Sequence, residues 1–554
     1  MSNWRLNLIF FLFVFFGLAI IGRLFYLQAL KGDYYRAIAH GQQKTIKKVN
    51  GERGRIFFNG GQILAANEEG KFLYISPKEI EDKEETAKAI SGIINFSETA
   101  ILEKIKRDDY FKLLKPKLTV EEINSLKKLN LKGIYLGDSL FRNYPQASMA
   151  SQVVGFLSGE RGQYGVEGYY DERLKGKGGL MEKLRTPWGY LTSSIDRSAM
   201  RGDDIWLTIN YNIQFRAEGL LQEAKKNLDI ESGQIIVMEP SSGKILALAN
   251  FPNFDPNQYQ KYANEEKFAL FQNSAIQKIF EPGSAFKPIT MAAALEEGRI
   301  TPQTTYVDEG KVQFNGRNLF NFAKKKWGER TMTEVLEKSI NTGAVFAERQ
   351  IGDEKFLKYI ELFKFFEPTG VDLEGETFSI NPGLKKGKEI NFATAAFGQG
   401  IEMTLLQLSR AFSAIANGGK IMNPYIVEKI VGSNVTERKP EITSSVISAK
   451  TASQLTAMLV SVVENGYGKM AKVPGYYIAG KTGTAQVPYE NKKGYSDKTI
   501  QSFIGFGPAF DPKFLILVKL DNPKARTAEY SAAPIFGDLA KYIIDYLEIP
   551  PDYE

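Results

Sequence analysis

Apolar residues fill the segment 6–30 almost without interruption, apart from Asn7, Arg23 and Gln28. A helix rises about 1.5 Å per residue, so this segment can cross the ~30 Å hydrocarbon core of a membrane. The run is longer and bulkier than the apolar core of a cleaved signal peptide, which has about 7–15 residues. We predict an uncleaved transmembrane signal anchor over residues 6–30, preceded by a cytoplasmic tail at residues 1–5.

The charges beside this span do not decide its orientation. Arg5 precedes it, and basic residues follow it at positions 31, 36, 44, 47 and 48. A simple count of positive charges would keep the rest of the chain in the cytoplasm. However, long domains are translocated largely regardless of such charges. The side of the membrane on which the rest of the chain lies must therefore be inferred from its predicted function.

Between residues 31 and 200, short strand patterns alternate with helical ones. Residues 71–80 read as a strand, and residues 119–129 read as an amphipathic helix. Glycine is dense over residues 155–189, which indicates loops between small elements. We predict a separate N-terminal module over residues 31–200.

The pattern is more regular over residues 201–554, where we predict a second domain. A strand at 205–209 leads into a long helix, and residues 234–252 have the β-turn-β pattern of a hairpin. Three more strands are predicted at 476–487, 499–508 and 514–521, followed by a helix at 532–547. Mainly helical patterns lie between the hairpin and these late strands. The order predicts an α+β fold whose antiparallel sheet is built from both ends of the domain around an inserted helical block.

Composition narrows the possible chemistry. The chain has 554 residues, too many for one hydrophobic core, and its net charge of +7 arises from 71 basic and 64 acidic residues. That small excess does not favour nucleic acid as a partner. The absence of cysteine excludes Cys-based metal sites, and His40 as the only histidine argues against Ser-His-Asp triads and His-based zinc sites. We expect no metal and no cofactor, and any acyl-transfer chemistry needs lysine or a carboxylate as its base.

A serine followed by lysine at i+3 provides such a base where both lie on one helical face. The pattern occurs three times, as Ser125–Lys128, Ser241–Lys244 and Ser284–Lys287. The first pair lies in a charged helix, and the second lies in the hairpin turn. Only the third opens an apolar helix, in EPGSAFKPITMAAALEEG (281–298), where Gly298 is a plausible C-cap. This context selects Ser284 as the candidate nucleophile and Lys287 as its candidate base.

Two later motifs strengthen that choice. S-x-x-K followed by a Ser/Asn pair and K-T-G is the combination of penicillin-binding proteins and class A β-lactamases. Ser339 and Asn341 lie in an apolar-periodic helical run, whereas the alternative pair Ser379–Asn381 is followed directly by Pro382. K-T-G occurs once, at Lys481–Gly483 in a strand pattern, where the glycine is expected to let substrate approach. Its lysine would supply a second cation near Lys287 or an anchor for a substrate carboxylate.

On these motifs the chain resembles class B penicillin-binding proteins, which are peptidoglycan D,D-transpeptidases. The resemblance extends to GQG (398–400), GKTGTAQ (480–486), RNYPQASMASQVVGF (142–156) and YGVEGYYDERLKGKGG (164–179). It implies a penicillin-binding, serine β-lactamase-like transpeptidase domain, preceded by an elongated pedestal or dimerisation-like module. One departure stands in RGRIFFNGGQILA (53–65), where Phe58, Asn59 and Gly60 replace the family's Asp-Arg-Asn. This leaves open a polar contact at the junction of the modules.

The resemblance also implies a role for each motif residue. Ser284 is the acyl-accepting nucleophile, Lys287 is its general base, and Ser339 and Asn341 relay protons and position substrate. Lys481 and Thr482 bind the terminal carboxylate of the donor peptide, with Gly483 and Thr484 beside it. The oxyanion hole consists of the backbone N–H groups of Ser284 and Thr484. The implied reaction transfers a stem peptide to Ser284 with release of D-Ala, and then to an amine of a neighbouring stem. β-Lactams would acylate the same serine.

The implied substrate, peptidoglycan, places the catalytic domain on the extracytoplasmic side of the cytoplasmic (inner) membrane, on a single-pass anchor. The expected partners are stem peptides, β-lactams, the membrane, a membrane-embedded lipid II polymerase and other division or elongation proteins. A D,D-carboxypeptidase or β-lactamase on the same fold is one alternative, although no Glu-x-x-Leu-Asn-like segment lies between Asn341 and Lys481. A non-catalytic β-lactam sensor or divisome scaffold is another.

Overall fold

The computed structural model describes residues 3–33, 35, 44–49, 51–106, 111–185, 191–197, 200–314, 317–489 and 494–553. His40, the only histidine, lies outside the described residues. The chain forms two compact units, which are residues 1–53 with 175–202, and residues 54–174 with 203–554. Each unit is described by itself below.

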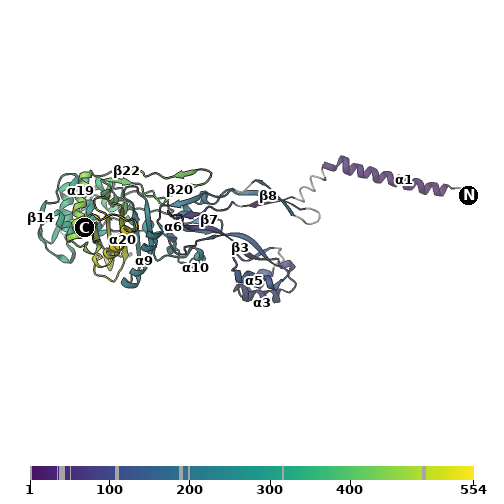
Figure 1. The fold of residues 1–554 in the computed structure, drawn as a ribbon, viewed down its shortest axis with the longest axis horizontal. Helices are drawn as coiled ribbons and strands as arrows, with labels where there is room; N and C mark the ends of the chain where they lie inside the picture. The colour runs from purple at the N-terminus through teal and green to yellow at the C-terminus, as the bar shows by residue number, and fades with distance from the viewer. Residues whose placement is uncertain are drawn as a thin grey trace. The chain divides into compact units, whose positions relative to one another are not determined.

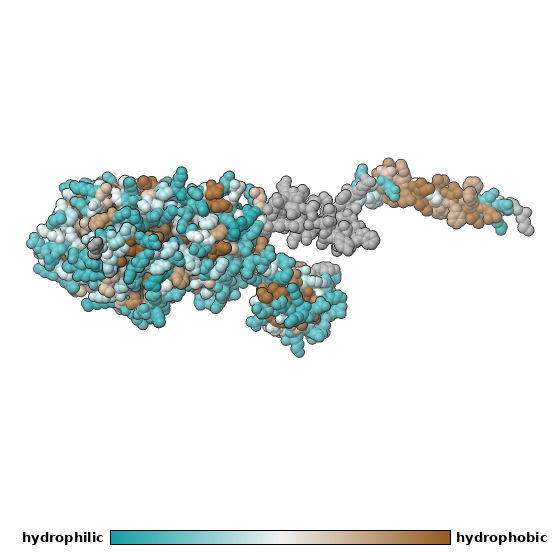
Figure 2. Space-filling view, viewed as in Figure 1, coloured by the Kyte–Doolittle hydropathy of each residue, from teal (hydrophilic) through white to brown (hydrophobic). Residues whose placement is uncertain are grey.

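The first unit begins with one long apolar helix. Helix α1 (Trp4–Phe25) continues into the π-helical turn η1 (Tyr26–Leu30), and an 18-residue window within Trp4–Leu30 has a mean hydropathy of 2.6. None of its residues is buried, and apolar side chains cover its surface (Figure 2). By length and composition this helix can cross a membrane, as predicted. A three-stranded antiparallel sheet completes the unit in the order β1 (Lys44–Val49), β8 (Gly179–Arg185) and β9 (Leu191–Arg197).

In the second unit, one sheet joins strands that are far apart in the sequence. Strand β2 (Ile56–Phe57) pairs in parallel with β10 (Asp204–Leu207), and β10 pairs antiparallel with β20 (Val427–Val431). The sheet continues through β3 (Ile63–Ile75), β4 (Lys112–Lys115), β5 (Ile134–Asn143) and β21 (Val435–Glu437). The predicted strand at 71–80 is thus the end of β3, because Pro77 begins a short 3-10 turn.

Small helices cover the outer strands of this sheet. Helices α3 (Lys83–Ile94), α4 (Glu98–Ile105) and α5 (Val120–Leu129) bury one apolar cluster with β3 and β4. Thr119 and Glu122 form a reciprocal capping box that starts α5, so the predicted helix at 119–129 is confirmed. The glycine-rich segment contains the short elements α6 (Ser151–Val154), β6 (Phe156–Ser158), β7 (Arg161–Gln163), α7 (Gly165–Tyr169) and α8 (Asp171–Leu174).

Residues 58–60, which depart from the family pattern, still make a polar contact at the junction. Phe58 is fully buried and packs edge-on against Tyr211, with ring centroids 5.3 Å apart. The Asn59 side chain donates a hydrogen bond to Glu428 Oε2 at 2.8 Å, and its backbone N–H donates to Ile209 O. An apolar contact thus occupies the first of these positions, and the neighbouring asparagine supplies the polar contact.

The second sheet is built from the strands that the sequence predicts for it. Its antiparallel strands run in the order β12 (Ile245–Phe251), β11 (Ser232–Met238), β25 (Phe514–Asp521), β24 (Tyr495–Gly507) and β23 (Ala479–Pro488). The predicted hairpin and all three late strands are therefore confirmed. Helices α9 (Tyr211–Leu228) and α20 (Ala532–Tyr546) lie side by side and share an apolar core with this sheet (Figure 1).

A block of helices packs on the other side, as the α+β prediction required. It contains α12 (Lys287–Glu296), α13 (Met332–Glu337), α14 (Asn341–Ile351), α15 (Asp353–Leu362), α16 (Pro382–Lys385), α17 (Glu389–Ala395), α18 (Leu405–Ala416) and α19 (Ala449–Asn465). Two small antiparallel strand pairs interrupt it, β14 (Thr305–Asp308) with β17 (Gly328–Thr331), and β15 (Lys311–Phe314) with β16 (Arg317–Phe320). Side chains from the block and the sheet share one large core.

Candidate active site

The sequence predicts Ser284 in the first turn of a regular α-helix, but the residue lies in a tighter turn that precedes the helix. The turn is the 3-10 segment η5 (Gly283–Phe286), and α12 begins at Lys287. A 3-10 turn brings residues i and i+3 into register, so Ser284 and Lys287 share one face. Ser284 is partly exposed, whereas Lys287 is fully buried. Gly298 ends the helix with a φ of +63°, the conformation that its predicted capping role requires.

Gly398 packs against the backbone of this turn and fixes its position. The Gly283 N–H donates a hydrogen bond to Gly398 O at 3.0 Å, and Gly398 itself has a φ of +81°. A Cβ atom on Gly398 would overlap the backbone of Gly283. Glu281 fixes the same segment by accepting a hydrogen bond from the Gly400 N–H at 2.9 Å. The GQG segment therefore sets the position of η5, which carries the candidate nucleophile Ser284 and is called the nucleophile turn below.

The Lys287 amine lies at the centre of the site. Its Nζ is 3.0 Å from Ser284 Oγ, 2.6 Å from Ser339 O, 2.8 Å from Asn341 Oδ1 and 3.2 Å from Ser339 Oγ. A carbonyl and an amide oxygen can only accept, so they take two N–H groups of the amine. In the neutral amine, the remaining lone pair is then available to the Ser284 hydroxyl. This geometry suits removal of the serine proton.

Electrostatics favour that neutral form. Burial, followed by repulsion from the Lys481 ammonium, holds the pKa of Lys287 well below its ordinary value. Lys481 is also fully buried, and burial lowers its pKa to about 7. Neither lysine has a carboxylate partner among the residues that the structure describes, and buried groups with such shifted pKa values are typical of functional sites.

Ser339 bridges the two lysines. Its Oγ accepts a hydrogen bond from Lys481 Nζ at 2.9 Å and lies 3.2 Å from Lys287 Nζ. The predicted helical run breaks at this residue, because Ser339 has a φ of +54° between α13 and α14. The break turns the Ser339 carbonyl toward Lys287, so the residue presents both its oxygens to the lysines. Asn341 follows at the first position of α14.

The K-T-G segment lies on β23, the edge strand of the sheet. Lys481 Nζ also contacts Thr482 O and Thr482 Oγ1, at 3.1 and 3.3 Å. The approach of substrate at Gly483 stays a prediction, and a side chain there would meet Ser502 Oγ, Pro282 O and Ala285 Cβ. The glycine therefore admits the nucleophile turn to the inner face of the strand. Thr484 is partly exposed, and its carbonyl would lie 2.9 Å from a Cβ on Gly283.

Two backbone groups in this site carry no sequence signal. The Ser339 carbonyl accepts from Lys287, and the Phe320 carbonyl accepts from Asn341 Nδ2 at 3.1 Å. Every residue has a carbonyl group, so residue identity cannot mark these acceptors. The strained φ of Ser339 is likewise a property of the folded chain.

Two family models match the chain. The penicillin binding protein transpeptidase domain matches residues 233–541, more than half of the 554 residues. The penicillin-binding protein dimerisation domain matches residues 48–207. The chain is a class B penicillin-binding protein.

Alignments with similar proteins cover nearly the whole length of this penicillin-binding protein. Stage V sporulation protein D of Bacillus subtilis is 33% identical over 96% of this chain and 84% of its own length. The probable peptidoglycan D,D-transpeptidase PbpC of Pseudomonas aeruginosa is 30% identical over 99% of this chain and 96% of its own. The crystal structure of penicillin binding protein 3 from Mycobacterium tuberculosis complexed with aztreonam has a TM-score of 0.72 and 26% identity, covering 91% of this chain and 98% of that one.

The alternative motif matches in this penicillin-binding protein lie elsewhere. Lys128 is exposed on α5, and Lys244 pairs with Glu428 at 2.7 Å in the hairpin turn. Asn381 donates to Glu402 O at 3.0 Å and does not contact Lys287. Structural context therefore separates Ser284–Lys287 from the other serine–lysine pairs, as predicted.

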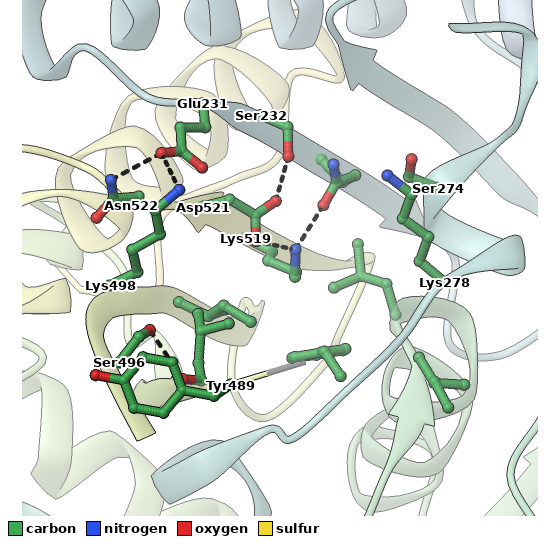
Figure 3. A pocket seen from close by; sticks show the side chains of 16 residues that line it. Glu231, Ser232, Ser274, Lys278, Tyr489, Ser496, Lys498, Lys519, Asp521 and Asn522 are labelled. Carbon is green, nitrogen blue, oxygen red and sulfur yellow. Dashed lines mark hydrogen bonds and ion pairs between the residues drawn. The ribbon is translucent and has the colours of Figure 1, made fainter. Parts of the chain in front are cut away.

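A cavity of about 610 Å³ also lies in this domain, but the predicted site residues do not line it (Figure 3). Its apolar wall includes Phe280, four residues before Ser284. Its charges are largely paired with one another, Lys519 with Asp521 at 2.5 Å and Lys498 with Glu231 at 2.7 Å (Figure 3). The cavity thus borders the strand that leads to the nucleophile turn and is separate from the serine–lysine centre.

Proposed function

We propose that this chain is a peptidoglycan D,D-transpeptidase that works through an acyl-enzyme on Ser284. The observation that carries the proposal is the buried Lys287 amine, 3.0 Å from a partly exposed serine hydroxyl. Family membership supports the class of substrate, since several relatives are named peptidoglycan D,D-transpeptidases. Related solved structures hold the β-lactams aztreonam and ampicillin.

In the first step, Lys287 Nζ takes the proton of Ser284 Oγ while Oγ bonds to the carbonyl carbon of the penultimate D-Ala. The backbone N–H groups of Ser284 and Thr484 stabilise the negative charge that develops on the carbonyl oxygen. The C–N bond to the terminal D-Ala then breaks. Lys287 returns the proton to the departing amine, with the Ser339 hydroxyl as relay. The donor stem remains as an ester on Ser284.

In the second step, an amine of a neighbouring stem attacks the ester carbonyl. It loses its proton by the same route, the new amide forms, and Ser284 Oγ leaves and regains a proton. Asn341 holds Lys287 and positions the donor peptide. Before D-Ala leaves in the first step, Lys481, Thr482 and Thr484 bind the donor's terminal carboxylate, and Gly483 keeps the strand close to the nucleophile turn.

The same chemistry supports the proposed location. Peptidoglycan lies outside the cytoplasmic membrane, so we assign residues 31–200 and 201–554 to the extracytoplasmic side as pedestal and catalytic modules. Residues 6–30 are the single-pass anchor, and residues 1–5 are the cytoplasmic tail. A membrane-embedded lipid II polymerase, with other division or elongation proteins, is the proposed partner of the anchor and pedestal.

Crosslinking of uncrosslinked nascent peptidoglycan by the detergent-solubilised full chain tests this function. The expected products are crosslinked muropeptides and one D-Ala per crosslink, both absent with Ser284→Ala. Release of D-Ala without crosslinks would support the carboxypeptidase alternative instead. Normal wall crosslinking in cells that carry only Ser284→Ala would support a non-catalytic scaffold.

A further inference from the structure

Asp308 is a fully buried carboxylate that the proposed mechanism does not use. It ends strand β14 and accepts hydrogen bonds from the Gly310 N–H at 2.9 Å and the Trp327 N–H at 2.8 Å. The Thr342 hydroxyl donates to it at 2.6 Å, and Asn321 Nδ2 contacts both its oxygens at 3.0 and 2.9 Å. Every one of these partners is a donor, so both oxygens of the side chain act as acceptors.

One of its two side-chain donors is the sequence neighbour of Asn341 itself, and the other is the sequence neighbour of the residue that binds the Asn341 side chain. Thr342 follows Asn341 directly, and its N–H donates to Asn321 Oδ1 at 3.1 Å. Asn321 follows Phe320, whose carbonyl accepts from Asn341 Nδ2 at 3.1 Å. Asp308 is therefore the hub of a closed network that fixes the backbone of Asn341 on one side and its hydrogen-bond acceptor on the other.

This network sets the orientation of the Asn341 amide. With Nδ2 directed to Phe320 O, the other end of the amide, Oδ1, faces Lys287 Nζ at 2.8 Å. If the Phe320 carbonyl moved away, the amide could rotate and present Nδ2 to Lys287. The amine would then lose one of the two acceptors that direct its lone pair toward Ser284.

We propose that Asp308 is a positioning residue for acylation, acting through Asn341 on Lys287; this rests on the proposed function. A carboxylate is required because several donors converge on it. An asparagine would bring an N–H group into that ring of donors and leave at least one of them unpaired. A side chain that nowhere touches Lys287 or Ser284 thus controls the direction of the proton transfer.

A double-mutant cycle on the full chain in detergent tests this. The variants are Asp308→Asn, Asn341→Ala and the double variant, and the readouts are the acylation rate constant and the pre-acylation Kd for a fluorescent penicillin. We expect Asp308→Asn to slow acylation at least 10-fold with Kd changed less than about 3-fold, and the double variant to be no slower than Asn341→Ala. Multiplied losses, or a wild-type rate with Asp308→Asn, would overturn the proposal.

Further variants separate positioning from folding. Thr342→Val removes the donor with little change in volume and should slow acylation, whereas Thr342→Ser keeps the hydroxyl and should restore the rate. These substitutions test the network even if Asp308→Asn does not fold, and equal rates for the two would contradict it. Asp372 is the matched control, a buried carboxylate that accepts from the Ile426 and Val427 N–H groups at 2.7 and 2.9 Å. Asp372→Asn should lower the Tm and leave the acylation rate unchanged; equal slowing by both Asp→Asn variants would overturn the positioning role.

The two proposals fail in different ways. A wild-type chain that is not acylated contradicts the proposed function. A wild-type chain that is acylated on Ser284 at a rate indifferent to Asp308 contradicts only the positioning role.

Discussion

Ser284 Oγ and Lys287 Nζ lie 3.0 Å apart, yet one is reached from solvent and the other is fully buried. In the proposed mechanism, this difference lets a lysine take the place of a histidine as the base. The hydroxyl must meet a substrate, whereas the amine must be desolvated to lose its proton near neutral pH. The 3-10 turn at Gly283–Phe286 provides both environments within four residues.

Replacing Lys287 by alanine should reduce the acylation rate about 10²–10⁴-fold, the usual contribution of a general base. The measurement is the rate of labelling by a fluorescent penicillin, with near-UV circular dichroism to check the fold. Lys128→Ala is the control, because that lysine belongs to another serine–lysine pair and is exposed on α5. Unchanged acylation by Lys287→Ala would show that another group acts as base.

Replacing Lys481 by methionine should move the rising limb of the pH–acylation profile to higher pH. The Lys481 ammonium lowers the pKa of Lys287, so its removal stabilises the Lys287 ammonium and delays deprotonation. The position of the limb is compared after each profile is scaled to its own maximum, since the variant also loses contacts to substrate.

Lys519→Met serves as the control for this shift, because Lys519 is a largely buried lysine on β25 of the same sheet that pairs with Asp521. The rising limb of the pH–acylation profile of Lys519→Met should stay at the wild-type pH. A Lys481→Met limb at the wild-type pH would contradict the repulsion between the two site lysines.

Replacing Gly398 by alanine should slow acylation at least 10-fold and lower the Tm. Gly398 has a φ of +81°, which disfavours alanine, and the added Cβ would overlap the Gly283 backbone. The nucleophile turn must therefore shift. Gly383→Ala is the matched control, since a Cβ there meets nothing within 4 Å. Equal behaviour of the two variants would show that GQG does not hold the turn.

Glu218 should make folding stability fall as the pH rises. It is 9% exposed on α9, and burial raises its pKa to about 7, above the 4.5 of an unperturbed glutamate. The folded state therefore holds a proton that the unfolded state releases near pH 4.5. This stabilisation is complete below about pH 4.5, and roughly 3 kcal/mol of it is lost by about pH 7.

Differential scanning calorimetry between pH 5 and 8 measures this effect. Glu218→Gln should show a smaller decrease of Tm with pH than the wild type. Glu223→Gln, an exposed glutamate on the same helix, should keep the wild-type slope. Identical slopes for the wild type and Glu218→Gln would contradict the assignment.

The sequence predicted the catalytic sheet well, because its strands carry strong β patterns and flank a helical block. The same patterns missed the break at Ser339. Residues 331–348 have helical periodicity, and only packing of the folded chain imposes a φ of +54° there. The contact of Gly483 with the nucleophile turn could not be predicted for a related reason, since a strand pattern gives the alternation of faces but not which face meets that turn.

The serine, lysine, asparagine and threonine residues of the site could be identified from motifs, whereas the residues that hold them in place could not. Asp308 and Asn321 lie in a region of short strand pairs and carry no spacing that marks them as partners of Thr342. Lysine pKa values depend on burial, which is a property of the whole fold. The motifs therefore mark the groups proposed to react, and no motif marks Asp308 or Asn321, which are proposed to orient them.

The most direct test of the account is covalent labelling of the full chain by a fluorescent penicillin, followed by peptide mass spectrometry. We expect one adduct, on Ser284 in the segment EPGSAFKP (281–288), and none with Ser284→Ala. An adduct on another residue, or no adduct on a folded wild-type chain, would contradict it.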